Sequence, residues 1–277
     1  MANLNEQYPM LFACNLPVKG AERALLCDIQ RQVYQVIPLS LYDVLVENEN
    51  KTLADIKAAY ENEHDEIIDE YFEDLVKEEW AFFTDTPQYF PKMDLYWEQP
   101  TSLTNAIIDI FETTNLDFEN LFQQFSELGC EHVQIRCFAD KSLVYFQDIL
   151  NTIGTKRIIS IEFVIKFQKD WLDKNFLIPF CEENPRVASL CIYNAPENRT
   201  IQISSERMGL IFFSKSMISD KTHCGQISND AFIVNAKTFT EAQKHNTCLN
   251  RKISIDTEGY IRNCPSMKEH LDRKSVV

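Results

Sequence analysis

Residues 128–165 read LGCEHVQIRCFADKSLVYFQDILNTIGTKRIISIEFVI, and this stretch decides the fold class. Its composition predicts a strand at 132–138, a helix at 141–153 and a second, strongly apolar strand at 158–165. Gly154 follows the helix, at a position where a residue in the left-handed conformation commonly ends one. A strand, a helix and a strand in this order predict a parallel pair joined by a right-handed crossover.

The same alternation of helix and strand extends through residues 99–243. It predicts about four or five βα units, which are too few to close an eight-stranded barrel, so we expect an α/β fold with an open, half-barrel parallel sheet. The other predicted elements are a helix at 103–128 broken near Asn115, a helix at 170–181, strands at 187–193, 208–213 and 232–234, and a helix at 238–244.

Residues 1–98 are predicted to form a separate α+β domain, because the pattern changes at Glu98-Gln99-Pro100. Short strands lead into helices and then into a terminal hairpin at 80–90, an order typical of a winged-helix-like fold. The clearest helix, at 64–80, has one apolar face and one densely acidic face. The remaining predictions are strands at 11–18, 25–30 and 32–37, and helices at 39–46 and from the Thr52 cap to Tyr60.

The net charge of −15 is concentrated at the front of the chain. Residues 1–98 hold 20 acidic and 7 basic residues, residues 99–243 hold 18 and 13, and residues 244–277 hold 4 and 7. Nucleic-acid binding requires Lys and Arg to neutralise phosphates, so we expect no nucleic acid as partner. The acidic front favours a basic partner, or it serves only to keep the protein soluble.

Nothing in the sequence predicts export or insertion into a membrane. No stretch reaches the roughly 18 apolar residues of a membrane span, and the first residues lack the basic flank and apolar run of a signal peptide. The nine cysteines are an odd number in apolar surroundings, as expected for buried thiols in a reducing compartment. We therefore expect a cytoplasmic protein with no membrane partner.

Residues 245–264 read HNTCLNRKISIDTEGYIRNC and form the most specific motif of the chain. They predict a small β-hairpin with Gly259 in its turn, which would bring Cys264 beside the arm next to Cys248. Cys224 is the best candidate for a third metal ligand, although a tetrahedral zinc or iron–sulfur site needs one more. The alternative is an ordinary hairpin with two buried thiols.

The spacing Cys248-x10-Gly259-x4-Cys264, followed by Pro-Ser-Met, resembles the opening of a SPASM domain, the cysteine-rich extension of radical S-adenosylmethionine peptide maturases. Residues 248–267 look most like the SPASM-domain peptide maturases of grasp-with-SPASM systems, and the similarity extends to VKG at 18–20 and LGCEHVQIRCF at 128–138. The resemblance implies two partners, an ATP-grasp ligase and a short precursor peptide made on the ribosome. It also implies a partial SPASM segment at 244–277 behind a degenerate radical-enzyme-like domain at 99–243.

Within this resemblance, residues 1–98 look like a RiPP recognition element, the winged-helix domain that captures the leader of a ribosomally made, post-translationally modified peptide. Such domains take the leader as an added strand beside their third strand and against their third helix. The residues implied by position are Val33, Tyr34, Gln35 and Val36 on the strand, and Glu66, Asp69, Glu70 and Glu73 on the helix. The alternatives are core packing for Tyr34 and a solvated face for the acids.

Two features depart from the family. A radical S-adenosylmethionine enzyme needs a Cys-x3-Cys-x2-Cys loop, because three thiolates leave one iron of the cluster open for the cofactor, and the sequence contains no such triple. SPASM domains continue into further cysteines, whereas residues 265–277 contain none. We therefore expect no radical activity and no S-adenosylmethionine. Any iron–sulfur or zinc site of Cys224, Cys248 and Cys264 is expected to be incomplete.

Three functions remain from the sequence. The first is a binding protein that captures the precursor peptide and presents it to the ATP-grasp ligase. The second is a metal-dependent enzyme that modifies the same peptide through Cys224, Cys248 and Cys264. The third, a winged-helix regulator of transcription, predicts a basic recognition face where the sequence offers an acidic one. The sequence has no P-loop, GxGxxG, GxSxG or HExxH motif, and it identifies no catalytic acid, base or nucleophile.

Overall fold

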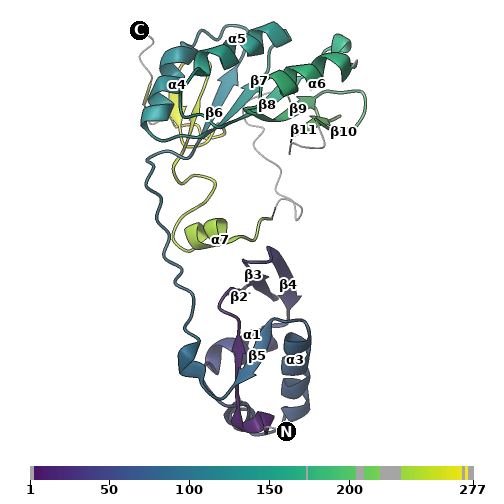
Figure 1. The fold of residues 1–277 in the computed structure, drawn as a ribbon, viewed down its shortest axis with the longest axis vertical. Coiled ribbons are helices and arrows are strands. Elements are labelled where there is room, and N and C mark those ends of the chain that lie inside the picture. Colours follow the sequence, from purple (N-terminus) through teal and green to yellow (C-terminus); the bar gives the residue numbers. More distant parts are fainter. Residues whose placement is uncertain (1–2, 173, 204–208, 219–231, 270–271, 274–277) are drawn as a thin grey trace. The chain divides into compact units, whose positions relative to one another are not determined.

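The computed structural model describes residues 3–172, 174–203, 209–218, 232–269 and 272–273. The chain divides into two compact units (Figure 1), one from residues 1–98 and 227–245 and the other from residues 99–226 and 246–277. Each unit has its own hydrophobic core. The chain therefore leaves the first unit after Glu98 and later returns to it with the segment that carries helix α7 (Ala236–Ala242).

The first unit holds a three-stranded antiparallel sheet with the order β2-β3-β4 and a separate antiparallel pair, β1 with β5. Its strands are β1 (Tyr8–Leu11), β2 (Asn15–Lys19), β3 (Ala24–Asp28), β4 (Val33–Ile37) and β5 (Ala81–Thr84). Its helices are α1 (Leu39–Glu47), α2 (Leu53–Ala59) and α3 (Asp65–Lys77), besides α7 and the 3-10 helices η1 (Leu4–Glu6) and η2 (Pro87–Tyr89).

The helices of this unit start and pack as their sequences predict. The Thr52 hydroxyl caps α2 by accepting a hydrogen bond from the Asp55 N–H at 3.2 Å. Ile68, Phe72 and Leu75 are the buried residues of α3 and lie on one face of it. The sheet and α1–α3 therefore share one hydrophobic core.

The predicted terminal hairpin at 80–90 is wrong. β5 pairs with β1 from the start of the chain, where Phe83 lies opposite Pro9. Pro87 then begins the short helix η2. A proline has no backbone N–H to offer a returning strand, so the chain turns away from β5 instead of folding back along it.

The second unit is built on a nine-stranded sheet with the order β10-β11-β9-β8-β7-β6-β12-β13-β14. The run from β11 to β12 is parallel, and the strands beyond it at both edges are antiparallel. The strands are β6 (Asn105–Ile110), β7 (His132–Cys137), β8 (Ser160–Lys166), β9 (Val187–Tyr193), β10 (Arg199–Gln202), β11 (Leu210–Phe213), β12 (Lys252–Ile255), β13 (Tyr260–Arg262) and β14 (Asp272–Arg273).

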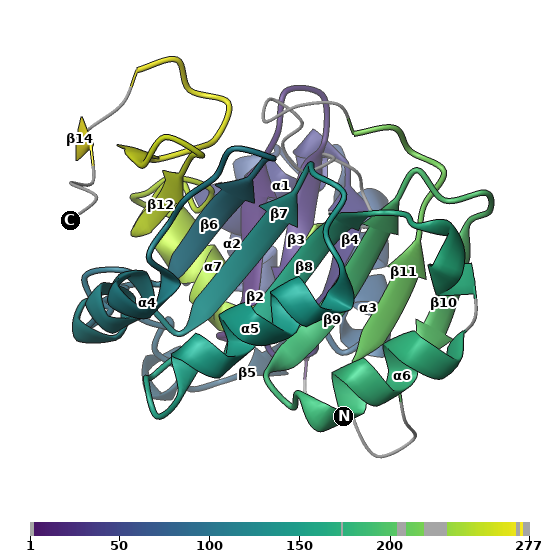
Figure 2. The ribbon, with the colours of Figure 1, turned by 90° about the horizontal axis from the view of Figure 1, so that it is seen from above.

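Helices α4 (Phe118–Glu127), α5 (Leu143–Ile153) and α6 (Lys174–Glu183) cover one face of this sheet, as Figure 2 shows. The 3-10 helix η3 (Lys169–Leu172) precedes α6. The residues of β6, β7 and β8 that face the helices are apolar and fully buried, for example Ile108, Ile135 and Phe163. The open, mostly parallel α/β sheet predicted from the sequence is confirmed.

Two element predictions in this part of the chain are wrong. Residues 103–128 are not one helix: β6 and α4 share them, because Ala106, Ile108 and Ile110 alternate into the core with the period of a strand. Residues 232–234 form no strand but lead into α7. The C-terminal hairpin of β12 and β13 is present, yet it also extends the large sheet, because β12 pairs in parallel with β6. No helix among the described residues combines the length and apolarity needed to cross a membrane.

Candidate functional site

Strand β4 forms an open edge of the first unit's sheet. Its one strand partner among the described residues is β3, which pairs with it from Asp28–Val33 to Ala24–Ile37. Four of its five residues are exposed, including the side chains of Val33, Tyr34 and Val36. An exposed edge presents a row of backbone N–H and C=O groups to which another chain can pair. The four strand residues predicted to bind a peptide therefore lie on an accessible edge.

A groove of about 620 Å³ runs along this edge between β4 and α3. One wall is β4 itself, and the other includes Tyr71, Asp74 and Glu78 from α3 and the residue after it. The Tyr71 hydroxyl lies 2.9 Å from the Ser40 Oγ, which ties α3 to α1. The described residues that line the groove are 33–38, Leu41, Tyr71, Asp74, Leu75, Glu78 and Trp80.

The four acidic residues predicted for this role lie elsewhere on α3. The described lining of the groove includes none of Glu66, Asp69, Glu70 and Glu73. With 3.6 residues per turn, Glu66, Asp69 and Glu73 fall on the side of the helix opposite Tyr71, and Glu70 falls between the two sides. Asp69 is held in an ion pair with Lys57, with an N–O distance of 2.6 Å. The buried positions Ile68, Phe72 and Leu75 fix the helix rotation, and they could have identified Asp74 and Glu78 from the sequence.

The turn from β3 to β4 is fixed by the buried carboxylate of Asp28. It accepts hydrogen bonds from the backbone N–H groups of Gln30 at 2.9 Å and Arg31 at 2.7 Å, and it pairs with the Arg31 guanidinium. Burial alone would raise the pKa of Asp28, but these bonds to Arg31 and Gln30 outweigh it and the pKa is lowered. Gln32, with φ of 61°, completes the turn before β4 begins.

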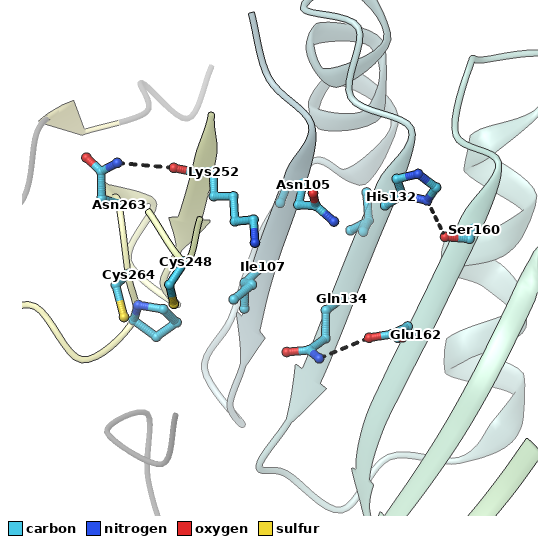
Figure 3. A pocket seen from close by; sticks show the side chains of 13 residues that line it. Asn105, Ile107, His132, Gln134, Ser160, Glu162, Cys248, Lys252, Asn263 and Cys264 are labelled. Atoms are coloured by element: carbon cyan, nitrogen blue, oxygen red, sulfur yellow. Dashed lines mark hydrogen bonds between the residues drawn. The ribbon is translucent and has the colours of Figure 1, made fainter. Parts of the chain in front are cut away.

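In the second unit, a pocket of about 370 Å³ lies on the sheet face opposite the helices. Figure 3 shows Lys252, Asn105, His132 and Ser160 at the starts of four neighbouring strands along it. The His132 Nδ1 lies 2.8 Å from the Ser160 Oγ. In the described part of the chain no carboxylate binds this imidazole, so the pair lacks the third group that orients the base in a nucleophile triad.

Two more strand residues and two cysteines also line this pocket. The Gln134 side-chain amide donates to Glu162 at 3.2 Å, across β7 and β8. Cys248 is exposed, whereas Cys264 is buried with its Sγ 3.0 Å from the Ser266 Oγ. The motif predicted from the sequence therefore brings two thiols to one pocket (Figure 3).

The third predicted ligand, Cys224, lies outside the described residues. The described ranges contain no group of three His, Cys, Asp or Glu side chains that could hold a metal ion. Two thiols do not complete a tetrahedral zinc site or a cluster site. The residues that the structure describes therefore do not by themselves fit an iron–sulfur cluster or zinc.

A buried ion pair on the same sheet face was not predicted from the sequence. Asp109 on β6 lies directly opposite Arg136 on β7, and both are almost fully buried. The sequence does contain evidence for this pair. In each strand one charged residue, Asp109 or Arg136, alternates with the apolar residues that face the core. This evidence was hidden by the prediction of a helix over β6.

No protein-family model matches the chain, and no curated protein matches it either.

Proposed function

We propose that this protein recognises a ribosomally made precursor peptide and assists its maturation by presenting it to an ATP-grasp ligase. The observation that carries the recognition step is the exposed edge of β4 beside the groove against α3. An extended leader would add to the sheet as a fourth strand next to β4. Main-chain hydrogen bonds then supply affinity, and the groove supplies selectivity for side chains.

The size of β4 sets the scale of the affinity. Its five residues can exchange only a few backbone hydrogen bonds with an added strand, each worth about 0.5–1.5 kcal/mol net. Ordering a disordered leader costs about 2–5 kcal/mol, so side chains in the groove must contribute as well. We therefore expect a dissociation constant in the micromolar range, which corresponds to a binding free energy of about −8 kcal/mol.

The ligase and the cytoplasmic setting are the parts of the proposal that rest on the sequence. The ligase follows from the resemblance of residues 248–267 to SPASM-domain maturases of grasp-with-SPASM systems. The cytoplasmic setting is supported by cysteines that are all free thiols where the structure describes them. A presenting protein of this kind needs no catalytic residue of its own.

Strand addition is tested with the short precursor peptide that the proposed pathway requires, synthesised with single backbone N-methyl groups at successive leader positions. In an added strand, every second N–H group points toward β4 and the others point away from it. Methylation should therefore abolish binding at every second leader position and leave binding unchanged at the positions between them. Equal effects at all positions would exclude strand addition, and no binding of the unmodified peptide would exclude peptide recognition. Metal content is assayed on the same anaerobic sample: a stoichiometric iron–sulfur cluster together with binding would favour a peptide-modifying enzyme.

A further inference from the structure

We infer that the peptide site has two unlike walls, the second supplied by the segment before α7, so that the bound strand alternates basic and apolar side chains. The inference rests on the proposed function, since it describes which peptide the β4 edge selects. It requires that the side chains on the two faces of β4 lie next to different parts of the first unit. The register of the sheet shows that they do.

On β4, Gln35 and Ile37 lie opposite Leu26 and Ala24 of β3, which belong to the core under α1–α3. Tyr34 lies opposite Cys27, which belongs to a different cluster on the other face of the sheet. Because side chains of a strand alternate between faces, an added strand next to β4 would do the same. Every second side chain would meet the α3 groove, and the others would meet the Tyr34 side.

The wall on the α3 side carries two carboxylates beside the apolar side chains of Leu41, Leu75 and Trp80. Asp74 and Glu78 are exposed, lie one helical turn apart and both line the groove. In the described part of the chain neither carboxylate forms an ion pair, in contrast to Asp69 on the far side of α3. Lys or Arg side chains at alternate positions of the ligand would complement these two charges.

The wall on the other side is aromatic and apolar. The ring of Phe232 meets the ring of Tyr34 edge to face, with 5.2 Å between centroids. Both residues remain exposed, Phe232 at 50% and Tyr34 at 40%, and Val36 on the same face of β4 is also exposed. Edge-to-face pairs of this kind favour a fixed arrangement of the two rings. Tyr34, Val36 and Phe232 therefore form a shelf onto which apolar ligand side chains can pack.

The position of Phe232 is anchored by the residues that follow it. Val234 is buried in one cluster with Cys27 of β3 and with Ile29 of the turn that follows this strand. Asn235 then caps α7 by accepting a hydrogen bond from the Thr238 N–H at 2.8 Å. The shelf is thus a property of the whole chain, because residues 1–98 alone do not contain its second ring.

The test uses two fluorescent peptides of about ten residues, long enough to span β4 with flanks on either side. Both contain equal numbers of Lys and Leu. One alternates them singly and the other arranges them in pairs, so the two share charge and composition. Fluorescence polarisation against the full-length chain should show about tenfold tighter binding of the alternating peptide.

Two pairs of variants separate the walls. Phe232→Ala should weaken the alternating peptide about tenfold, whereas Ile233→Ala, a neighbour that is 59% exposed, should not. Asp74→Asn/Glu78→Gln should weaken it at low salt, whereas Glu66→Gln/Glu73→Gln removes the same charge from the far side of α3 and should have little effect. Circular dichroism confirms that each variant is folded.

Equal binding of the two peptides, or equal effects within either pair of variants, would overturn the two-walled site. If the natural precursor still bound with backbone N-methyl effects at alternate positions, the proposed function would survive that result. Failure of the precursor and of both synthetic peptides to bind would remove the proposed function and this inference together.

Discussion

Arg136 and Asp109 form a two-point ion pair across neighbouring parallel strands, with Nε–Oδ1 and Nη2–Oδ2 distances of 2.7 and 2.8 Å. Their side chains keep only 6% and 2% of their exposure. The Arg136 guanidinium also lies 5.5 Å from the ring centre of Phe138. The pair links β6 to β7 on the sheet face opposite the helices.

Breaking this pair should be costly. Asp109→Ala removes the carboxylate that pairs with the buried Arg136 guanidinium, and we expect it to lower the free energy of unfolding by about 3–5 kcal/mol. Asp43→Ala is the control, because Asp43 pairs with Lys19 at the surface and its loss should cost at most about 1 kcal/mol. Urea denaturation followed by circular dichroism measures both. Equal midpoints for the two variants would show that the buried pair contributes no more stability than the surface pair.

The sequence predicted most of the sheet but misread its first parallel strand. The strands at β7, β8 and β9 were found because long apolar, β-branched runs alternate with amphipathic helices. Asn105–Ile110 was absorbed into a longer helix, because NAIIDI is short and also fits the apolar face of one. What makes it a strand is its place between β7 and β12, and β12 lies more than 140 residues away in the sequence. Pairing over such a distance leaves no local pattern to read.

Of the residues at the candidate peptide site, some were predicted from the sequence and others were not. The exposed strand residues of β4 followed from position within the resemblance, and their local sequence already predicted a strand. The four predicted acidic residues do not line the groove, because charge density alone does not show which side of a helix faces it. Nothing in the sequence near Phe232 predicted its place at this site, since its contact with Tyr34 joins residues about 200 positions apart.

The Asp28 turn predicts a specific loss of stability in acid. Its lowered pKa means that the native state favours the carboxylate more than the unfolded chain does. This stability is fully present above the unfolded value of about 3.9, and it is lost as the pH falls through the lower pKa of the folded protein. Asp28→Asn should therefore destabilise the protein by about 1–3 kcal/mol at pH 7, with a difference from the natural protein that shrinks below about pH 4.

Thermal unfolding of both proteins across this pH range measures the effect. Asp94→Asn provides a matched control, because Asp94 is exposed. A constant difference between Asp28→Asn and the natural protein from pH 7 to pH 3 would contradict the role of the carboxylate. The same variant should weaken peptide binding, because the turn holds the start of β4 at Val33.

The cysteines should differ sharply in reactivity toward alkylating reagents. Burial raises the pKa of Cys130 to about 12 and that of Cys137 to about 11, so almost none of either thiol is the reactive thiolate at pH 8. Cys248 is exposed. Iodoacetamide followed by peptide mass spectrometry should label Cys248 in the native protein and leave Cys130 and Cys137 unmodified until urea is added. Labelling of Cys137 as fast as Cys248 would show that the sheet opens readily around it.

The negative charge of the first unit should increase the association rate constant of a basic peptide. Residues 1–98 carry 20 acidic and 7 basic residues, and the field of such a surface extends over roughly one Debye length, about 8 Å at physiological salt. Raising the salt from about 50 to 500 mM should therefore lower the association rate constant of the alternating Lys–Leu peptide about tenfold or more, because electrostatic steering is screened. The dissociation rate should change much less, since it depends on backbone pairing and on packing against Tyr34 and Phe232. Stopped-flow fluorescence measures both constants, and a peptide with Gln in place of Lys is the control. An association rate that is independent of salt for both peptides would leave strand pairing as the source of affinity and remove the acidic surface from the mechanism.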